Sequence, residues 1–280
     1  MVTNTSLAMD NMPPLSVLAI GGSDPGGGAG IQADLRMFNY LAVYGFSVIT
    51  AVTSQNTREV KGVLALSKTD IDGQLAAIAE DAVLAATKTG MLATAGAVEA
   101  VAEFVENKKA GVFVIDPVIM STTGTSLLDK EGVELLKSRL IPLCRVITPN
   151  LTEAQTLTGI RIEKPEHAEE AAKELVAIGA RAACVTGGHW PGRPVDVLYD
   201  GREIEIFEGT RSGEGAGFHG TGCLFSAALT CYLARDRKLP AAIADAKRLV
   251  QAAIAGSVRS GGGMRVPWLG VRLEPGHPNH

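Results

Sequence analysis

Short apolar runs that are typical of buried strands recur along the chain and alternate with stretches of helical spacing. The runs are residues 15–20, 46–53, 112–116, 146–148 and 182–186, and the helical stretches include 31–40 and 224–234. This alternation predicts an α/β fold with a central, mostly parallel β-sheet. Residues 197–199 and 204–207 flank Asp200-Gly201, which predicts an edge hairpin.

The composition is that of one globular domain with loose ends. The chain has 280 residues, of which 46% are hydrophobic and 5% aromatic, enough for one large core. Residues 1–14 are polar and end in prolines, and the last residues are rich in Gly, Pro and His. We therefore expect a disordered tail over 1–14, a single domain over 15–260 and a flexible tail over 261–280.

Charge and cysteine usage narrow the class of partner. The formal net charge of -4 and the absence of a basic run argue against a nucleic-acid partner and against a membrane partner. The four cysteines, Cys144, Cys184, Cys223 and Cys231, form no CxxC pair, which indicates reduced thiols rather than a zinc site or a disulfide framework. Without an apolar stretch of signal-peptide or membrane-spanning length, we expect a cytoplasmic protein.

The segment His219-Gly220-Thr221-Gly222-Cys223 precedes the apolar run 224–234 and predicts a tight turn followed by a helix start. Gly220 and Gly222 let backbone N–H groups point outward, and such groups at a helix N-terminus bind phosphate oxygens. Cys223 would lie in the first turn, where the helix field lowers a thiol pKa and makes proton acceptance near neutral pH plausible. The alternative is a glycine loop before a core helix in which Cys223 only packs.

Two better-known glycine motifs do not fit. Residues 28–33 match GxGxxA, but these glycines lag the strand by several residues, and the next strand ends in Ser54-Gln55-Asn56 without an acid, which disfavours a dinucleotide site. No Gly-Lys-Ser/Thr tripeptide occurs, which excludes a Walker A loop. The predicted phosphate site is therefore of another kind.

Asp34 and Gln55 are candidates for binding a small polar ring. Asp34 lies on the predicted helix 31–40, and Gln55 closes the second strand. A primary amide can accept from an exocyclic amine and donate to an adjacent ring nitrogen. In the alternative interpretation Asp34 is a solvated helix residue and Gln55 a turn residue.

Asn150 and Glu153 follow the strand at 146–148. Asn150 suits a helix N-cap with Glu153 as its capping-box partner, which is a sufficient structural explanation. Glu153 could also hold a water of a hydrated Mg²⁺ ion that bridges nucleotide phosphates. The two roles are compatible.

Eight ordered motifs resemble one family. They are Gly21-Gly22-Ser23-Asp24-Pro25, residues 27–34, Val48-Ile49-Thr50-Ala51 with Gln55-Asn56-Thr57, Lys88-Thr89-Gly90-Met91-Leu92, Asp116-Pro117-Val118, Thr148-Pro149-Asn150 with Glu153-Ala154, Thr186-Gly187-Gly188-His189 and residues 219–223. From about residue 15 to 258 the chain resembles the hydroxymethylpyrimidine/phosphomethylpyrimidine kinases of thiamin biosynthesis, in the ribokinase-like superfamily.

The resemblance implies a ribokinase-like fold, with helices on both faces of the sheet, assembled as a homodimer. It also implies ATP- and Mg²⁺-dependent phosphorylation of 4-amino-5-hydroxymethyl-2-methylpyrimidine and then of its monophosphate. By position, the implied site comprises the pyrimidine pocket Gly22, Asp34, Gln55 and Val118, the anion hole Gly220, Thr221 and Gly222, the catalytic Cys223, the nucleotide contacts Asn150, Thr186 and Lys247, and Glu153 as a metal ligand through water.

Several positions depart from the family pattern. Gly26 stands where Ser or Thr is common, Thr186 where many relatives have Lys, and Leu224 where Thr is usual. The approach loop 211–218 looks longer than usual. Thr186 puts one nucleotide contact in doubt, and the altered loop could change how the site closes.

Two other functions stay open. A pyridoxal or pyridoxine kinase of the same superfamily is the near alternative, because the ring-binding cleft is similar. A non-catalytic pyrimidine-binding protein on this scaffold is the distant one. Gln55 favours an aminopyrimidine over a pyridine, and the GTGC segment argues against a pure binder, which needs no phosphate site beside a base.

Overall fold

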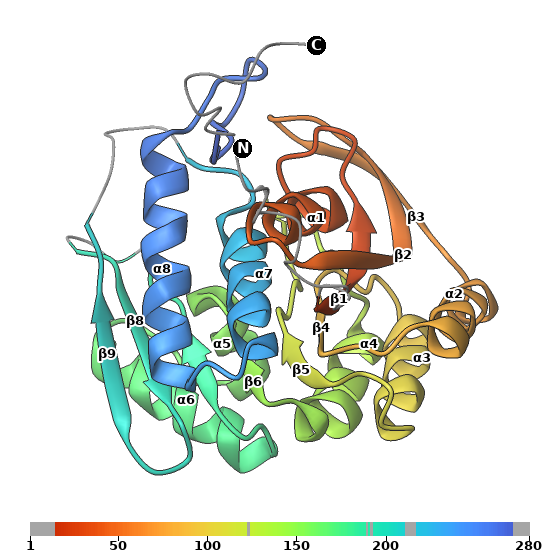
Figure 1. The fold of residues 1–280 in the computed structure, drawn as a ribbon. Coiled ribbons are helices and arrows are strands. Elements are labelled where there is room, and N and C mark those ends of the chain that lie inside the picture. The colour runs from red at the N-terminus through yellow and green to blue at the C-terminus, as the bar shows by residue number, and fades with distance from the viewer. Residues whose placement is uncertain (1–14, 122–123, 189, 191–192, 211–216, 271–280) are drawn as a thin grey trace, which may run out of the picture.

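The computed structural model describes residues 15–121, 124–188, 190, 193–210 and 217–270. Its centre is a nine-stranded β-sheet in the order β3-β2-β1-β4-β5-β6-β7-β8-β9 (Figure 1). The strands are β1 (Ser16–Ser23), β2 (Tyr44–Gln55), β3 (Val60–Ala65), β4 (Ala86–Thr89), β5 (Val112–Ile115), β6 (Val146–Ile147), β7 (Ala183–Val185), β8 (Val195–Tyr199) and β9 (Ile204–Glu208). The strands from β2 to β7 in this order pair in parallel, so the predicted parallel sheet is confirmed.

Helices cover both faces of the sheet. They are α1 (Gly30–Tyr40), α2 (Lys68–Asp81), α3 (Ala95–Glu106), α4 (Lys130–Leu135), α5 (Leu151–Thr158), α6 (Pro165–Ile178), α7 (Thr221–Ala234) and α8 (Leu239–Ala255); a π-helical turn (Leu136–Leu140) and a 3₁₀ turn (Ile141–Leu143) continue α4. α1, α7 and α8 pack on one face, and α2 to α6 on the other (Figure 1).

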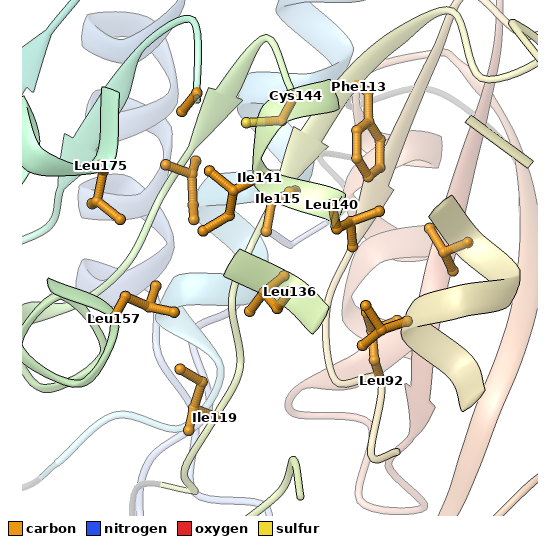
Figure 2. Close-up of a cluster of buried hydrophobic side chains, with 14 of the residues drawn as sticks. Leu92, Phe113, Ile115, Ile119, Leu136, Leu140, Ile141, Cys144, Leu157 and Leu175 are labelled. Atoms are coloured by element: carbon orange, nitrogen blue, oxygen red, sulfur yellow. The ribbon is translucent and has the colours of Figure 1, made fainter. Parts of the chain in front are cut away.

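Strand β1 shows why the sheet is buried on both sides. Val17 and Ala19 belong to the core under α1, α7 and α8, whereas Leu18 and Ile20 belong to the opposite core. All four side chains are fully buried, as expected for a central parallel strand with an unbroken apolar run. Figure 2 shows part of the second core, where Phe113 of β5 lies in one cluster with Leu92, Ile115, Leu136, Leu140 and their neighbours.

The sequence pattern located most elements and missed two strands. The predicted hairpin is confirmed, because β8 and β9 pair in antiparallel fashion, and Asp200 N donates to Glu203 O at the turn. β3 and β4 were not predicted. β4 reads Ala-Thr-Lys-Thr and lacks an apolar run, although all four of its residues are buried.

The segment after α8 lies against the domain up to residue 270. Met264 N donates to Thr57 O at 2.9 Å, and His219 N donates to Arg265 O at 3.0 Å. These bonds join the loop after β2 to the turn before α7. Residues 1–14 and 271–280 lie outside the described part, and the domain limits at 15 and 260 stay a prediction. Among the described residues, none of the helices is both long and apolar enough to cross a bilayer.

Candidate active site

A cleft of about 960 Å³ lies beyond the carboxyl ends of the parallel strands. Crevices in this position bind ligands in open α/β sheets. The cleft brings together every site residue expected from the sequence: Gly22, Asp34, Gln55, Val118, Asn150, Glu153, Thr186, Gly220, Thr221, Gly222, Cys223 and Lys247. Their individual roles remain predictions.

The first turn of α7 opens into this cleft. Gly220 is the N-cap, with a left-handed backbone (φ 86°), and Leu224 N donates to Gly220 O at 3.1 Å. The N–H groups that precede this bond have no acceptor within the helix, and Thr221, Gly222 and Cys223 line the cleft. The predicted helix start is confirmed, and the helix begins earlier than residue 224. Such a terminus is suited to bind an anion.

The two glycines of this turn have different roles. A Cβ on Gly220 would lie 1.9 Å from Gly28 O, and its φ is positive, so this glycine is required by the backbone. A Cβ on Gly222 would meet no atom within 4 Å, and Gly222 lies in the helix without a positive φ. The expectation that both glycines form the tight turn is therefore wrong for Gly222. Gly222 instead leaves open space in front of the helix terminus.

The prediction that the helix start lowers the thiol pKa of Cys223 is also wrong. Cys223 is half-buried as a residue, and burial of its thiol raises the pKa to about 12. Lys88 lowers this pKa, whereas Asp116 and Asp34 raise it. A thiolate here would join two carboxylates and one ammonium, and this local charge together with desolvation outweighs the helix field. Cys223 is therefore a protonated thiol in the free protein at neutral pH.

A buried ionic cluster lies at the base of the cleft. Lys88 Nζ of β4 lies 2.8 Å from Asp34 Oδ1 and 3.9 Å from Asp116 Oδ2, and its side chain is fully buried. Ser226 Oγ of α7 donates to Asp116 Oδ2 at 2.8 Å. Four elements, α1, β4, the end of β5 and α7, thus meet at one charged point. Lys88 stands in one of the family-like motifs, but its pairing had no signal in the sequence, because its partners lie far away along the chain.

Asp34 lines the cleft as a buried carboxylate that is paired with Lys88. Its side chain is 2% exposed and accepts a hydrogen bond from Lys88. Burial raises the pKa of Asp34 to about 6, although Lys88 opposes this rise. The interpretation of Asp34 as a solvated helix residue is therefore wrong, because the residue is buried. Asp34 lines the cleft, and its contact with a ring stays a prediction.

Gly22 and Val118 border an apolar wall of the cleft. Gly22 follows a register shift in β1, and a Cβ on it would lie 2.9 Å from Met91 Sδ. Val118 packs in a small cluster with Ala51, Met91 and Leu127. This wall is suited to the face of a planar ring.

Gln55 is the polar counterpart of that wall. It is the last residue of β2, as predicted, and it is half-buried. Its Nε2 lies 2.8 Å from His219 Nε2, and the same His219 nitrogen lies 3.0 Å from Asp24 Oδ2. The sequence pointed to Gln55 and not to these partners, which lie on two other loops.

Asn150 and Glu153 form the capping box that the sequence predicted. Asn150 Oδ1 accepts from Glu153 N at 2.9 Å, and Glu153 Oε2 accepts from Asn150 N at 2.8 Å. Burial raises the pKa of Glu153 to about 8, and Asp116 adds to this rise. Within the described ranges no group of three or more His, Cys, Asp and Glu side chains is placed to hold a metal ion. Any metal here would depend on ligand oxygens and water as well.

Thr186 and Lys247 lie at the opposite end of the cleft. Thr186 pairs with Asn150 in an isolated parallel bridge, and its Oγ1 donates to Pro149 O at 3.3 Å. Lys247 Nζ of α8 donates to Asp196 Oδ2. Asp196 also accepts from Gly187 N at 2.9 Å, so it ties the loop after β7 to α8. Sequence reasoning missed Asp196.

The structure shows how two of the departures from the family pattern are accommodated, and it describes part of the third. Gly26 N donates to Asp24 Oδ1 at 2.8 Å, so the loop is held without a hydroxyl at this position. Leu224 of α7 is 5% exposed and belongs to the core that α1, α7 and α8 share with the sheet. Of the approach loop 211–218, residues 211–216 lie outside the described part, and Phe218 pairs with Arg265 in an isolated bridge.

The sheet order, the helix layers and the α7 terminus at the strand ends define a ribokinase-like protein. The sequence matches the model of the phosphomethylpyrimidine kinase family over residues 24–267. The chain belongs to this family of phosphotransferases.

Named relatives and solved structures agree with this assignment. The chain is 42% identical to the hydroxymethylpyrimidine/phosphomethylpyrimidine kinase of Streptomyces coelicolor, over 90% of this chain and 93% of that protein. It is 43% identical to the thiamine biosynthesis bifunctional protein ThiED of Geobacter sulfurreducens, over 86% of this chain but only 49% of that longer protein. An ADP complex of Bacillus subtilis pyridoxal kinase has a TM-score of 0.82 at 36% identity, covering 91% of this chain and 98% of that one.

Proposed function

We propose that the protein is an ATP-dependent kinase that phosphorylates 4-amino-5-hydroxymethyl-2-methylpyrimidine and then its monophosphate, in thiamin biosynthesis. The observation that carries the proposal is the family match over 244 residues that include the α7 terminus and the ring-sized apolar wall. Two relatives, of Streptomyces coelicolor and Haemophilus influenzae, carry both kinase activities in their names.

The proposed reaction uses the α7 terminus as its anion site. The N–H groups of Thr221, Gly222 and Cys223 bind oxygens of the transferred phosphoryl group. The substrate hydroxyl oxygen forms a bond to the γ-phosphorus while the bond from that phosphorus to the ADP oxygen breaks. Fixed N–H donors at this point neutralise charge without reorganisation, so they lower the barrier.

Cys223 is the proposed acceptor of the hydroxyl proton. Its thiol is protonated in the free protein, because burial and two nearby carboxylates raise its pKa to about 12. Acceptance of a proton therefore requires additional positive charge in the loaded cleft. Lys88 already acts in that direction. The role of Cys223 as a base is thus conditional on the bound substrates.

The carboxylates at the base of the cleft fit a Mg²⁺–nucleotide complex. Burial and the nearby Asp116 raise the pKa of Glu153, and a bound cation would relieve this cost of ionisation. Bound Mg²⁺ supplies positive charge to the nucleotide phosphates. Glu153 would contact it through water, because one of its oxygens is already used by Asn150 N. Asn150, Thr186 and Lys247 are the proposed nucleotide contacts.

A homodimer is proposed from the outer face of the β2–β3 pair. Val52 and Leu64 are cross-strand partners and are 45% and 66% exposed. Tyr44 of β2 is exposed as well, whereas Val63 is exposed on the opposite face of β3 from Leu64. Apolar side chains gathered at a sheet edge are typical of an interface. The cytoplasmic location stays a prediction.

A coupled ATPase assay tests the proposed activity. The substrates are the aminopyrimidine, its monophosphate, pyridoxal and a sugar, each with Mg²⁺ and ATP. We expect turnover with the first two compounds. Turnover with pyridoxal alone would instead support the second candidate, a pyridoxal kinase, which the structural likeness to pyridoxal kinases of Bacillus subtilis and Staphylococcus aureus favours.

A further inference from the structure

A segment that follows α8, residues 256–268, borders the cleft, and we call it the strap. Figure 1 shows it in dark blue next to the loop between β2 and β3. Val258 N donates to Val266 O at 2.9 Å and Val266 N to Val258 O at 3.0 Å, which closes the strap into a short loop. Trp268 N donates to Ala253 O at 2.9 Å, so the far end of the strap is tied back to α8. The strap therefore has a fixed course.

Backbone hydrogen bonds join the strap to two rims of the cleft. Met264 N donates to Thr57 O at 2.9 Å, and Gly263 N donates to Thr57 Oγ1 at 3.0 Å. A Cβ on Gly263 would lie 2.1 Å from Thr57 O, so these two segments touch backbone to backbone. On the other side His219 N donates to Arg265 O at 3.0 Å. These bonds place Met264 between the loop after β2 and the turn before α7.

The same two rims carry the polar side of the proposed ring subsite. Gln55 stands two residues before Thr57, and its Nε2 lies 2.8 Å from His219 Nε2. Gln55, His219 and Met264 all line the cleft. Met264 is half-buried, and its Sδ lies 3.3 Å from the position that a Cβ would take on Gly217. The thioether is therefore part of the cleft surface in the neighbourhood of the Gln55 amide.

A planar ring that is bound by its polar edge also needs apolar atoms against its faces. The wall formed by Gly22 and Val118 supplies such atoms from the sheet side of the cleft, and Met264 supplies a further apolar group from the strap. A thioether is flexible and polarizable, and it makes favourable contacts with aromatic rings. Its position in the free protein leaves it partly exposed to the cleft, so a bound ring would bury it further.

We propose that Met264 is a further substrate-contacting residue, whose thioether covers the heteroaromatic ring that Gln55 binds by its edge. The inference rests on the proposed function, since it assumes that the ring subsite lies at Gln55. The contact is made to the ring itself and not to a polar substituent. It therefore favours planar heteroaromatic rings over sugars and distinguishes little between a pyrimidine and a pyridine.

Two substitutions of similar size separate an apolar contact from simple filling of space. Met264→Leu keeps an apolar side chain, whereas Met264→Gln keeps the length but replaces the thioether and its methyl group by an amide. Both retain the backbone N–H that donates to Thr57, so their melting temperatures should match the wild type. The matched control is Val258→Ala, because Val258 belongs to the same described strap, is 40% exposed and lies outside the cleft lining.

Isothermal titration calorimetry measures two affinities for these four proteins. They are the Kd of Mg²⁺–AMP-PCP and, with AMP-PCP saturating, the Kd of 4-amino-5-hydroxymethyl-2-methylpyrimidine. We expect Met264→Gln to weaken aminopyrimidine binding by about fivefold or more, since it loses the sulfur–aromatic contact. Met264→Leu should stay within about threefold of the wild type and Val258→Ala within about twofold. The Kd of AMP-PCP should change less than about twofold throughout.

Oxidation of the wild type gives a second readout that needs neither a variant nor turnover. Hydrogen peroxide converts methionine to its sulfoxide, and peptide mass spectrometry follows the rate at Met264. A saturating aminopyrimidine should slow this rate by about fivefold or more, because the ring covers the sulfur. AMP-PCP alone should change the rate less than about twofold. This measurement keeps the inference open to refutation if a Met264 variant does not fold.

The outcomes distinguish this inference from the proposed function. In a wild type that binds and phosphorylates the aminopyrimidine, an unchanged Kd in Met264→Gln or the absence of protection by the ring overturns the inference alone. Equal loss of aminopyrimidine and AMP-PCP binding in Met264→Gln also overturns it, because the residue would then support the cleft and not contact the ring. If the wild type neither binds nor phosphorylates the aminopyrimidine, the proposed function is wrong and the inference falls with it.

Discussion

Lys88 Nζ lies 2.8 Å from Asp34 Oδ1 in full burial, directly beneath the turn that carries Cys223. The partners come from β4 and α1, and Asp116 lies 3.9 Å from the same ammonium. The cluster holds two carboxylates and one ammonium. Lys88 therefore supplies the positive charge that compensates the two buried acids.

Lys88→Met should destabilise the protein by about 3–5 kcal/mol, because it leaves buried carboxylates without a partner. Urea unfolding measures the change. The control is Lys68→Met: Lys68 pairs with Asp72 and Glu103 at 2.9 and 2.8 Å, but in a partly exposed position, so we expect about 0–1 kcal/mol. Equal effects of the two substitutions would mean that the Lys88 cluster is not the buried ion pair described.

Gly220→Ala and Gly222→Val should fail in different ways. Alanine at 220 meets Gly28 O and a positive φ, so the melting temperature should fall. Valine at 222 enters open space in front of the helix terminus, so the protein should fold but lose about 10²- to 10³-fold in kcat. Thermal melting and steady-state kinetics compare the pair. An active Gly222→Val enzyme would mean that phosphate binds elsewhere.

Cys223→Ser should lower kcat by about 10²- to 10⁴-fold while the KM for ATP changes little, because a hydroxyl is a poorer proton acceptor. Steady-state kinetics measures both. In the free protein, alkylation of Cys223 by iodoacetamide should be slow at neutral pH and accelerate only toward strongly alkaline pH, since burial raises the pKa to about 12. The Ser variant identifies the labelled site. Normal turnover in that variant would remove Cys223 from the proposed reaction.

Glu153 should make folding stability depend on pH. Burial raises its folded-state pKa from 4.5 to about 8, so between these values the folded protein binds more protons than the unfolded chain. Stability is then fully present below about pH 4.5 and falls as pH rises toward 8. Glu153→Gln should flatten this fall by on the order of 1–4 kcal/mol, given about 1.4 kcal/mol per pKa unit. Urea unfolding at pH 5 and 8 measures it, and an unchanged slope would contradict the assignment.

Gln55→Leu should raise the KM for the aminopyrimidine about 5- to 150-fold, which corresponds to the ~1–3 kcal/mol cost of an unpaired buried polar group. The KM for ATP serves as the internal control and should stay within about twofold, because Gln55 lies in the proposed ring subsite and not among the proposed nucleotide contacts. If both KM values are unchanged, Gln55 ends β2 and has no part in ring binding.

Much of the fold was predictable because the spacing of apolar residues along the sequence matches the residues that are buried in the structure. The apolar run of β1 is buried on both faces, and the turn at Asp200 closes the hairpin that its flanking strands predict. β4 was missed because Thr87, Lys88 and Thr89 are consecutive polar residues and form no apolar run. Their burial depends on partners from distant segments, which no local window contains.

The sequence predicted which residues line the site. It predicted their protonation states and contacts less well. Gly220 and the Asn150–Glu153 box follow from local backbone rules, and both hold. The pKa of Cys223 does not follow from them, because it is raised first by burial of the thiol and then by Asp116 and Asp34, which the fold brings close. The contact of His219 with Asp24 joins residues 195 positions apart and likewise has no local signal.

The close approach of Gly28 and Gly220 has a consequence for how this site evolves. A Cβ on either glycine would strike the opposite loop, at His219 Cδ2 or at Gly28 O. The two glycine motifs are far apart in the sequence, but each limits which residues the other can accept. A relative that acquires a larger residue in one loop should carry a compensating change in the other, and a grafted loop should function only when both are transferred together.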